Sequence, residues 1–107
     1  MLTQRSRSSQ KTLKVTSEII AQRAINNKRS FISIVNTSLL GEVIYVSDGE
    51  TAEIGKGVPL WPGGVYQDNM VGTGDDPIYP SQDEIHVIAS ADTATIAVME
   101  KMVVRQV

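Results

Sequence analysis

The residues of this chain that could carry acid–base or metal chemistry are few and scattered. His86 is the single histidine, and there is no cysteine. A catalytic triad needs a histidine beside a nucleophile and an acid, and a zinc site needs several His or Cys ligands. One histidine in the alternating stretch Glu84-Ile85-His86-Val87 is typical of a strand residue on the solvent face. We therefore predict no catalytic residue and no zinc site.

Acidic residues gather in three short stretches, which are residues 48–50, 75–76 and 83–84. Their carboxylates could in principle hold calcium, but they do not have the spacing of an EF-hand loop, and Asp-Gly after a strand is more typical of a turn. Gly72-Thr73-Gly74 is not followed by the Lys and the helix that a phosphate-binding loop requires. The sequence therefore predicts no cofactor and a protein that is not an enzyme.

Charge is distributed unevenly along the chain. The first 14 residues contain Arg5, Arg7, Lys11 and Lys14 and no acid, so six Lys/Arg against 12 Asp/Glu give the remainder a net charge of −6. Residues 1–11 are rich in Ser, Arg and Gln and cannot become ordered by burial. We predict that they form an extended basic arm whose positive charges bind a partner. A protein partner is favoured over nucleic acid, because aromatic residues are not interleaved with the charges.

Length and hydropathy indicate one folded domain, which we place at residues 12–107. A chain of 107 residues with 41% hydrophobic residues can bury a single core. Its apolar runs are far shorter than the roughly 18 residues that a membrane span needs, and the N-terminus lacks the apolar segment of a secretion signal. We therefore expect neither a membrane partner nor standard secretion.

Alternation of apolar and polar residues recurs along the domain and predicts β-strands. It is found in residues 11–19, 30–36, 42–47, 84–89 and 94–100. Turn formers separate the second stretch from the third and the fourth from the fifth, which predicts two β-hairpins. Only residues 17–25 also fit a helix. We predict a small antiparallel β-sandwich, of the jelly-roll or immunoglobulin-like type, with an extended N-terminal arm.

Residues 57–66, Gly-Val-Pro-Leu-Trp-Pro-Gly-Gly-Val-Tyr, contain the single tryptophan between two prolines. Because proline has no backbone donor, this segment should run along a sheet edge or cross between sheets. Pro62-Gly63-Gly64 predicts a tight turn with positive φ, and Leu60 is the expected buried anchor. Trp61 has two interpretations, a lid over one end of the core or a half-exposed anchor for a partner.

Five segments of the chain, taken in order, resemble a group of small tailed-phage virion proteins. They are Arg-Ser-Phe-Ile-Ser-Ile-Val-Asn-Thr, Val-Ile-Tyr-Val-Ser, Gly-Val-Pro-Leu-Trp-Pro-Gly-Gly, Ile-His-Val-Ile-Ala and Thr-Ala-Thr-Ile-Ala-Val-Met-Glu. The resemblance covers Lys28 to Glu100, and the sharpest matches are Asn36, Leu60, Pro62 and Gly63, which are folding signatures. The loop at residues 68–81 is longer than in that pattern.

The resemblance implies a β-sandwich that is built into the phage particle. It makes the leading expectation a capsid decoration or cement protein on the virion surface, made in the host cytoplasm and bound to the major capsid protein. Because a shell offers symmetric sites, a homo-oligomer is expected, with a trimer as the first possibility and a dimer as the second. The arm residues would then contact neighbouring subunits.

Two alternatives stay open at the level of the sequence. One is another virion position, at the portal, the tail or a fibre base. The other is a carbohydrate-binding module that uses Trp61, Tyr66 and Tyr79 as a stacking platform, since three of the five aromatic residues lie between positions 61 and 79. A decoration protein needs its arm, whereas a sugar-binding module needs its aromatic residues.

Overall fold

Two four-stranded antiparallel sheets make up the fold. The structure is a computed structural model of the chain and describes residues 2–25, 27–72 and 77–105. These residues contain no helix, and hence none that could cross a membrane. The strands are β1 (Leu2–Thr12), β2 (Glu18–Ala21), β3 (Lys28–Asn36), β4 (Ile44–Asp48), β5 (Val58–Leu60), β6 (Val65–Asn69), β7 (Ile85–Ala89) and β8 (Thr95–Arg105). The predicted all-β, two-sheet class is confirmed, and the helix that residues 17–25 also allowed does not form.

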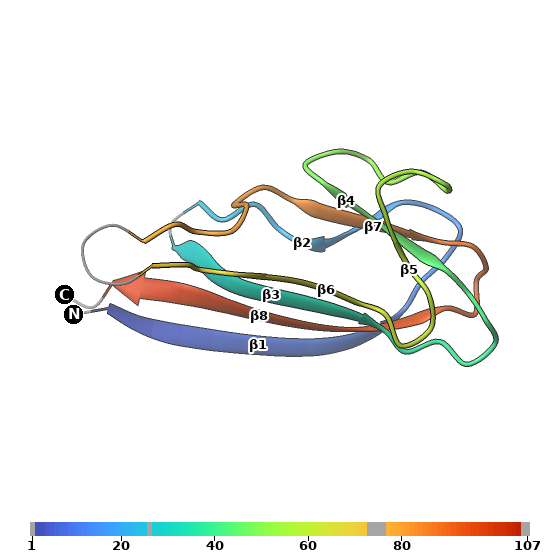
Figure 1. Cartoon of the computed structure of the whole chain (residues 1–107), viewed down its shortest axis with the longest axis horizontal. Coiled ribbons are helices and arrows are strands. Elements are labelled where there is room, and N and C mark those ends of the chain that lie inside the picture. Colours follow the sequence, from blue (N-terminus) through green and yellow to red (C-terminus); the bar gives the residue numbers. More distant parts are fainter. Residues whose placement is uncertain (1, 26, 73–76, 106–107) are drawn as a thin grey trace.

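The strand order is β1-β8-β3-β6 in one sheet and β2-β7-β4-β5 in the other. The two sheets face each other in an elongated molecule of 45 × 22 × 21 Å, and β1 begins and β8 ends at one end of it (Figure 1). The pairs β1·β8, β2·β7, β3·β6 and β4·β5 are the pairs that a single long hairpin would form, with β4 and β5 next to its turn. Here successive pairs lie alternately in the first and the second sheet. The pairs β3·β8 and β4·β7 then complete the sheets.

Apolar side chains from alternate strand positions fill the space between the sheets. Burial in β3 alternates along the strand, with Ile32 and Ile34 buried between the less buried Phe31, Ser33 and Val35. Each large aliphatic side chain removed from water contributes roughly 1.5–3 kcal/mol. The core consists of Leu13, Ala21, Ile32, Ile34, Ile44, Val46, Leu60, Ile85, Val87, Ala89, Ala94, Ile96 and Val98.

The two predicted hairpins are wrong in how their strands pair. β3 and β4 lie in different sheets, and so do β7 and β8, so that each connection crosses from one sheet to the other. Both strands of each pair have an apolar face, and such strands can either pair edge to edge or face each other across a core. The turn residues between them are compatible with both arrangements, which explains why the sequence pattern did not distinguish them.

The predicted N-terminal arm is extended, but it belongs to the sandwich. β1 pairs with β8 in one uninterrupted register from Leu2 opposite Arg105 to Thr12 opposite Thr95. A separate arm at residues 1–11 is therefore not confirmed for the part that the structure describes. The strand expected at residues 11–19 is instead divided, because buried Leu13 donates its N–H to the Ala94 carbonyl (2.8 Å) where the chain leaves the first sheet.

The segment around the two prolines follows the prediction. Pro59 lies in β5, which is an edge strand, and Leu60 is buried. Gly63 has a φ of 84°, and the Gly64 N–H donates to the Trp61 carbonyl (2.7 Å), which closes the tight turn. Positive φ at the third residue of a turn favours glycine, because a side chain there would clash with its own backbone.

Candidate functional site

Three large apolar side chains are exposed on two neighbouring loops at one end of the sandwich. Leu39 and Leu40 follow β3 and are 93% and 77% exposed, and Trp61 follows β5 and is 64% exposed. We call these three residues the apolar tip. The two loops lie at the end of the molecule opposite to that at which β1 begins and β8 ends (Figure 1). The interpretation of Trp61 as an exposed residue is therefore favoured over that of a lid on the core.

Asn36, at the end of β3, fixes both loops of the apolar tip. Its side chain is fully buried and its Nδ2 donates to the carbonyl oxygens of Glu42 (2.8 Å) and Leu60 (2.7 Å). Its Oδ1 accepts a hydrogen bond from the Ser38 N–H (2.9 Å). One amide therefore satisfies groups on both loops, so that the exposed apolar side chains are carried by an ordered backbone.

Backbone hydrogen bonds of the same residue hold the tryptophan turn. The Asn36 N–H donates to the Gly64 carbonyl (3.0 Å), and the Gly63 N–H donates to the Asn36 carbonyl (2.8 Å). Together with the side-chain bonds, they form what we call the Asn36 network. Asn36, Leu60 and Gly63, three of the residues described above as folding signatures, make contacts of this network and hold the two loops together.

Glu42 lies under the tip and is almost fully buried. Its Oε2 accepts from the Thr93 hydroxyl (2.7 Å) and its Oε1 from the Leu40 N–H (2.8 Å). The hydrogen bond from Thr93, aided by the backbone N–H groups of Glu42 and Leu40, lowers the pKa of Glu42 below its ordinary value. The carboxylate thus holds the backbone of Leu40 in place, and it is itself covered by the protein.

The three aromatic residues of the proposed sugar platform do not come together. Tyr66 packs against the core, and its burial, followed by the nearby carboxylates of Asp48 and Asp68, raises the pKa of its hydroxyl. Tyr79 lies at the start of β3, where Lys28 Nζ is 4.7 Å from its ring centroid. Trp61 lies at the other end of β3, and the strand between these ends is about 26 Å long.

The basic residues of the predicted arm lie on or just after β1. Arg5 and Lys14 are exposed. Arg7 Nη2 is 3.2 Å from Glu100 Oε1, and Lys11 forms an ion pair with Glu18. Arg5, Arg7 and Lys11 occupy alternate positions and therefore point to the same side of the sheet. Two of the four charges are thus engaged within the chain.

A buried ion pair that sequence reasoning missed lies near the start of β3. Arg29 is fully buried, and its Nε donates to Glu100 Oε2 at 2.7 Å. Its Nη1 donates to the carbonyls of Ser81 (2.7 Å) and Asp83 (3.0 Å), and its Nη2 to that of Gln22 (2.7 Å). We call this the Arg29–Glu100 pair. The two residues are 71 positions apart, so no local pattern could have paired them.

The residues considered for acid–base or metal chemistry do not form a site. His86 points to the outer face of its sheet, but its side chain is only 13% exposed, and Nε2 is 3.3 Å from Glu84 Oε1. It is more covered than predicted because Ile19 and Ser47 lie opposite it on the adjacent strands. Within the described ranges, no three His, Cys, Asp or Glu side chains are grouped to hold a metal ion. Residues 75 and 76 lie outside those ranges.

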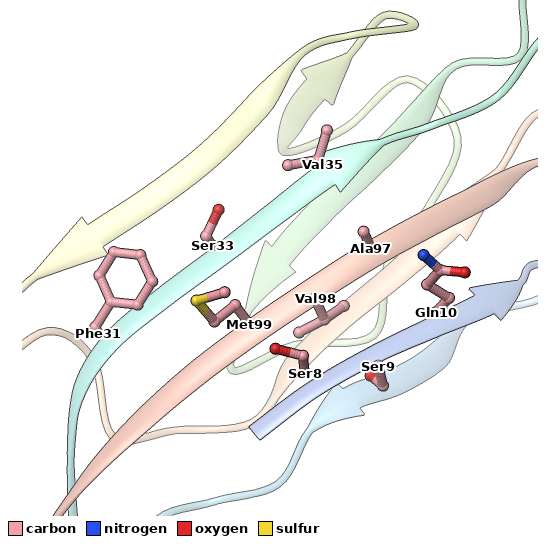
Figure 2. A pocket seen from close by; sticks show the side chains of 9 residues that line it. All are labelled: Ser8, Ser9, Gln10, Phe31, Ser33, Val35, Ala97, Val98 and Met99. Carbon is pink, nitrogen blue, oxygen red and sulfur yellow. The ribbon is translucent and has the colours of Figure 1, made fainter. Parts of the chain in front are cut away.

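An open groove of about 530 Å³ runs along the outer face of the sheet β1-β8-β3-β6. Figure 2 shows that its walls come from β1, β8 and β3. Apart from Gln10, the contributing side chains are small or apolar, and they include Ser8, Ser33, Ala97, Phe31, Val35 and Met99. Sequence reasoning did not find this groove, because it depends on the register between strands that are far apart in the chain.

Leu39 and Leu40 were also missed as candidates for binding. The only available signal was two adjacent apolar residues in a loop, and such a pair is as easily assigned to the core. Comparison of the sequence with protein-family models finds no matching family, and comparison with curated proteins finds no match either.

Proposed function

We propose that this protein is a structural component of a tailed-phage virion, most specifically a decoration or cement protein that binds the assembled shell of the major capsid protein. The observation that carries this proposal is the apolar tip. Three large apolar side chains stand in solvent on backbone that the Asn36 network holds in place. Exposed apolar residues on an ordered scaffold are typical of docking surfaces.

The ordered backbone matters because binding costs conformational entropy. Loops that are already fixed lose little freedom when they dock, so a larger share of the gain from burying Leu39, Leu40 and Trp61 contributes to affinity. A protein that binds the assembled shell and not the free subunits stabilises the shell by mass action. No chemical reaction is needed for this role.

The strand pairing supports a jelly-roll type for the sandwich. Pairs β1·β8, β2·β7, β3·β6 and β4·β5 correspond to one rolled-up hairpin, which is the arrangement that defines a jelly roll. Jelly rolls occur in viral capsid domains and in lectins. The fold type is therefore compatible with both the virion proposal and the carbohydrate alternative.

The β1 edge provides a second contact in this proposal. The other three sheet edges are β6, of five residues, β2, of four, and β5, of three with Pro59. β1 has 11 residues and neither proline nor glycine. A long unbroken edge can accept a further strand. We propose that an extended segment of a capsid subunit adds to β1, with an acidic residue opposite the exposed Arg5.

Co-sedimentation with assembled shells of the phage that encodes the chain tests the proposal. We expect Trp61→Ser, and Leu39→Ser combined with Leu40→Ser, to lower the bound fraction at least tenfold. Ile78→Ser is the matched control, because Ile78 is 69% exposed and is far from the tip. It bridges to Val71, next to Met70, whose N–H donates to the Ser30 carbonyl near the start of β3. Equal binding by the tip variants and the control would overturn the role of the apolar tip.

The same experiment separates the alternative virion positions and the sugar-binding module. Sedimentation with isolated tails instead of shells would assign the protein to the tail, and labelling of intact particles would reveal a portal or fibre-base position. Glycan binding that requires Tyr66 and Tyr79 as well as Trp61 would favour the carbohydrate module. The separation of these three residues along β3 is the reason why we place that module second.

A further inference from the structure

The outer face of the sheet β1-β8-β3-β6 is almost free of charge. Alternate residues of β3 and β8 point outward, because the residues between them are buried in the core. The outward residues at the centre of the sheet are Phe31, Ser33 and Val35 on β3 and Ala97, Met99 and Lys101 on β8. The outward positions that flank them on β1 and β6 carry Ser, Thr, Gln, Asn or Val. We call this surface the outer face.

Lys101 is the one charged residue at the centre of the outer face, and a second lysine, Lys28, lies at its end opposite Val103. Its Nζ lies 5.4 Å from the centroid of the Phe31 ring, so it covers an apolar side chain. The chain contains 12 acidic residues, and the rows of the outer face include none of them. A face that only contacts solvent usually carries interspersed charges of both signs. The centres of protein interfaces are depleted of charge.

The shape of the outer face suits a partner with the same surface. The groove has small residues, Ser8, Ser33 and Ala97, beside the larger Phe31 and Met99 (Figure 2). In a two-fold arrangement, the large side chains of one copy can enter the groove of the other. Methionine adapts its shape readily, and Met99 is 42% exposed in the single chain.

The area of the outer face is sufficient for such a contact. Strands β1, β8 and β3 each extend about 30 Å alongside the nine residues of β8 from Thr95 to Val103, whereas β6 has five residues and extends about 16 Å. At a strand spacing of about 4.8 Å, packing two such faces together would bury about 510 Å² on each copy, or about 1,000 Å² in total. Specific interfaces begin at about 1,000 Å².

From the charge, shape and area of the outer face, we propose that it binds the outer face of a second copy of this chain, related by a two-fold axis. The dimer thus formed does not depend on the capsid proposal, because the apolar tip and the outer face are different surfaces. Pairing of two β1 edges is disfavoured, because antiparallel registers that pair most of the strand bring Arg5, Arg7 and Lys11 of the two copies opposite one another.

Sedimentation equilibrium over a wide range of protein concentration tests this proposal. We expect a monomer–dimer equilibrium for the unmodified chain and a dissociation constant at least tenfold higher for Ala97→Glu, because the new carboxylate would be buried without a partner. Met99→Lys is a second variant at an exposed position, and circular dichroism checks that both variants fold. Ile78→Glu, outside the face, should leave the constant unchanged.

An additional variant separates the two possible dimers. Arg7→Ser should leave a face-to-face dimer unchanged, whereas it would strengthen a dimer formed through β1 edges by removing a repulsion. A chain that stays monomeric at all concentrations would overturn the proposal. So would a trimer, a dimer that Ala97→Glu and Met99→Lys do not weaken, or a dimer that Arg7→Ser tightens.

Discussion

Asn36 and Arg29 are both fully buried polar residues, and they lie near opposite ends of β3. Asn36 is neutral and satisfies the backbone of the two loops that present the apolar tip. Arg29 is charged, and it joins β8 through Glu100 to the segments that precede β3 and β7. Glu100 also contacts Arg7 of β1, so that the end with the ion pair includes the long edge strand.

The two ends of β3 differ in whether the polar residues there support a surface that a partner can cover. The Asn36 network is neutral, and the Glu42 carboxylate beside the apolar tip is already buried and hydrogen-bonded, so a partner can cover the tip without desolvating an exposed ion. At the other end, the two buried charges pair with each other, and Arg29 also donates to three backbone carbonyls. These contacts hold distant segments of the chain together. The comparison predicts that the end with the Arg29–Glu100 pair determines stability, while the end with the apolar tip determines docking as well as stability.

Replacing Arg29 should have the largest effect on stability. Arg29→Ala leaves Glu100 buried beside three carbonyls that have lost their donor, and such a loss typically costs about 3–5 kcal/mol. Urea denaturation measures the free energy of unfolding. Arg23→Ala is the matched control, because the ion pair of Arg23 with Asp83 is exposed and should contribute no more than about 1 kcal/mol. Similar losses for the two variants would contradict the assignment.

Asn36→Ala should come next in size and should affect both stability and docking. It removes the donors to the Glu42 and Leu60 carbonyls, and we expect a loss of about 2–4 kcal/mol, because a neutral buried group left unsatisfied lies toward the lower part of the range of about 1–3 kcal/mol. The folded fraction should also bind shells more weakly, because the loops of the tip are released. Thr37→Ala, at an adjacent exposed position, is the control. If the Asn36→Ala variant binds shells as well as the unmodified chain does, the Asn36 network is not needed for docking.

Glu42 makes the end with the apolar tip sensitive to pH. Its pKa is lowered from the ordinary 4.5, so its ionised form stabilises the fold above about pH 4.5, and this contribution is lost as the pH falls through the folded-state value. Glu42→Gln should therefore lower the melting temperature at pH 7, and the difference from the unmodified chain should shrink in acid. Glu50→Gln, at an exposed position, is the control. A difference that grows in acid would contradict the assignment.

Arg7→Ser should have the smallest effect. Arg7 is 62% exposed, and solvent-exposed ion pairs contribute about 0–1 kcal/mol, which added salt reduces further. The free energy of unfolding, measured at low and high salt, should change by less than 1 kcal/mol. A larger and salt-independent loss would mean that the end with the Arg29–Glu100 pair depends on all three charges and not mainly on Arg29 and Glu100.

Local sequence patterns were sufficient to predict those strands and that turn whose conformation depends only on residues close together in the chain. The alternation in residues 30–36 and 84–89, the edge position of Pro59 and the positive φ of Gly63 all follow from such patterns, and the structure confirms them. Each of these features is determined by residues within a few positions of one another.

Features that depend on pairing between distant segments could not be predicted. Residues 2–12 have the composition of a disordered segment, and they are ordered by a backbone ladder with β8 and not by burial. The sequence did indicate that something must hold this segment, but not that the holding surface belongs to the same chain. The same limit applies to the Arg29–Glu100 pair and to the groove of the outer face, because both depend on the register of strands β3 and β8.

The thermal stability of the shell tests the central claim most directly. Assembled shells would be melted in the presence of increasing concentrations of the unmodified chain, of Trp61→Ser and of Ile78→Ser. The proposed function predicts that the shell's melting temperature rises with the concentration of the unmodified chain and of Ile78→Ser until the sites are saturated, and that Trp61→Ser has a much weaker effect. A shell whose melting temperature stays constant at saturating protein would contradict a cementing role.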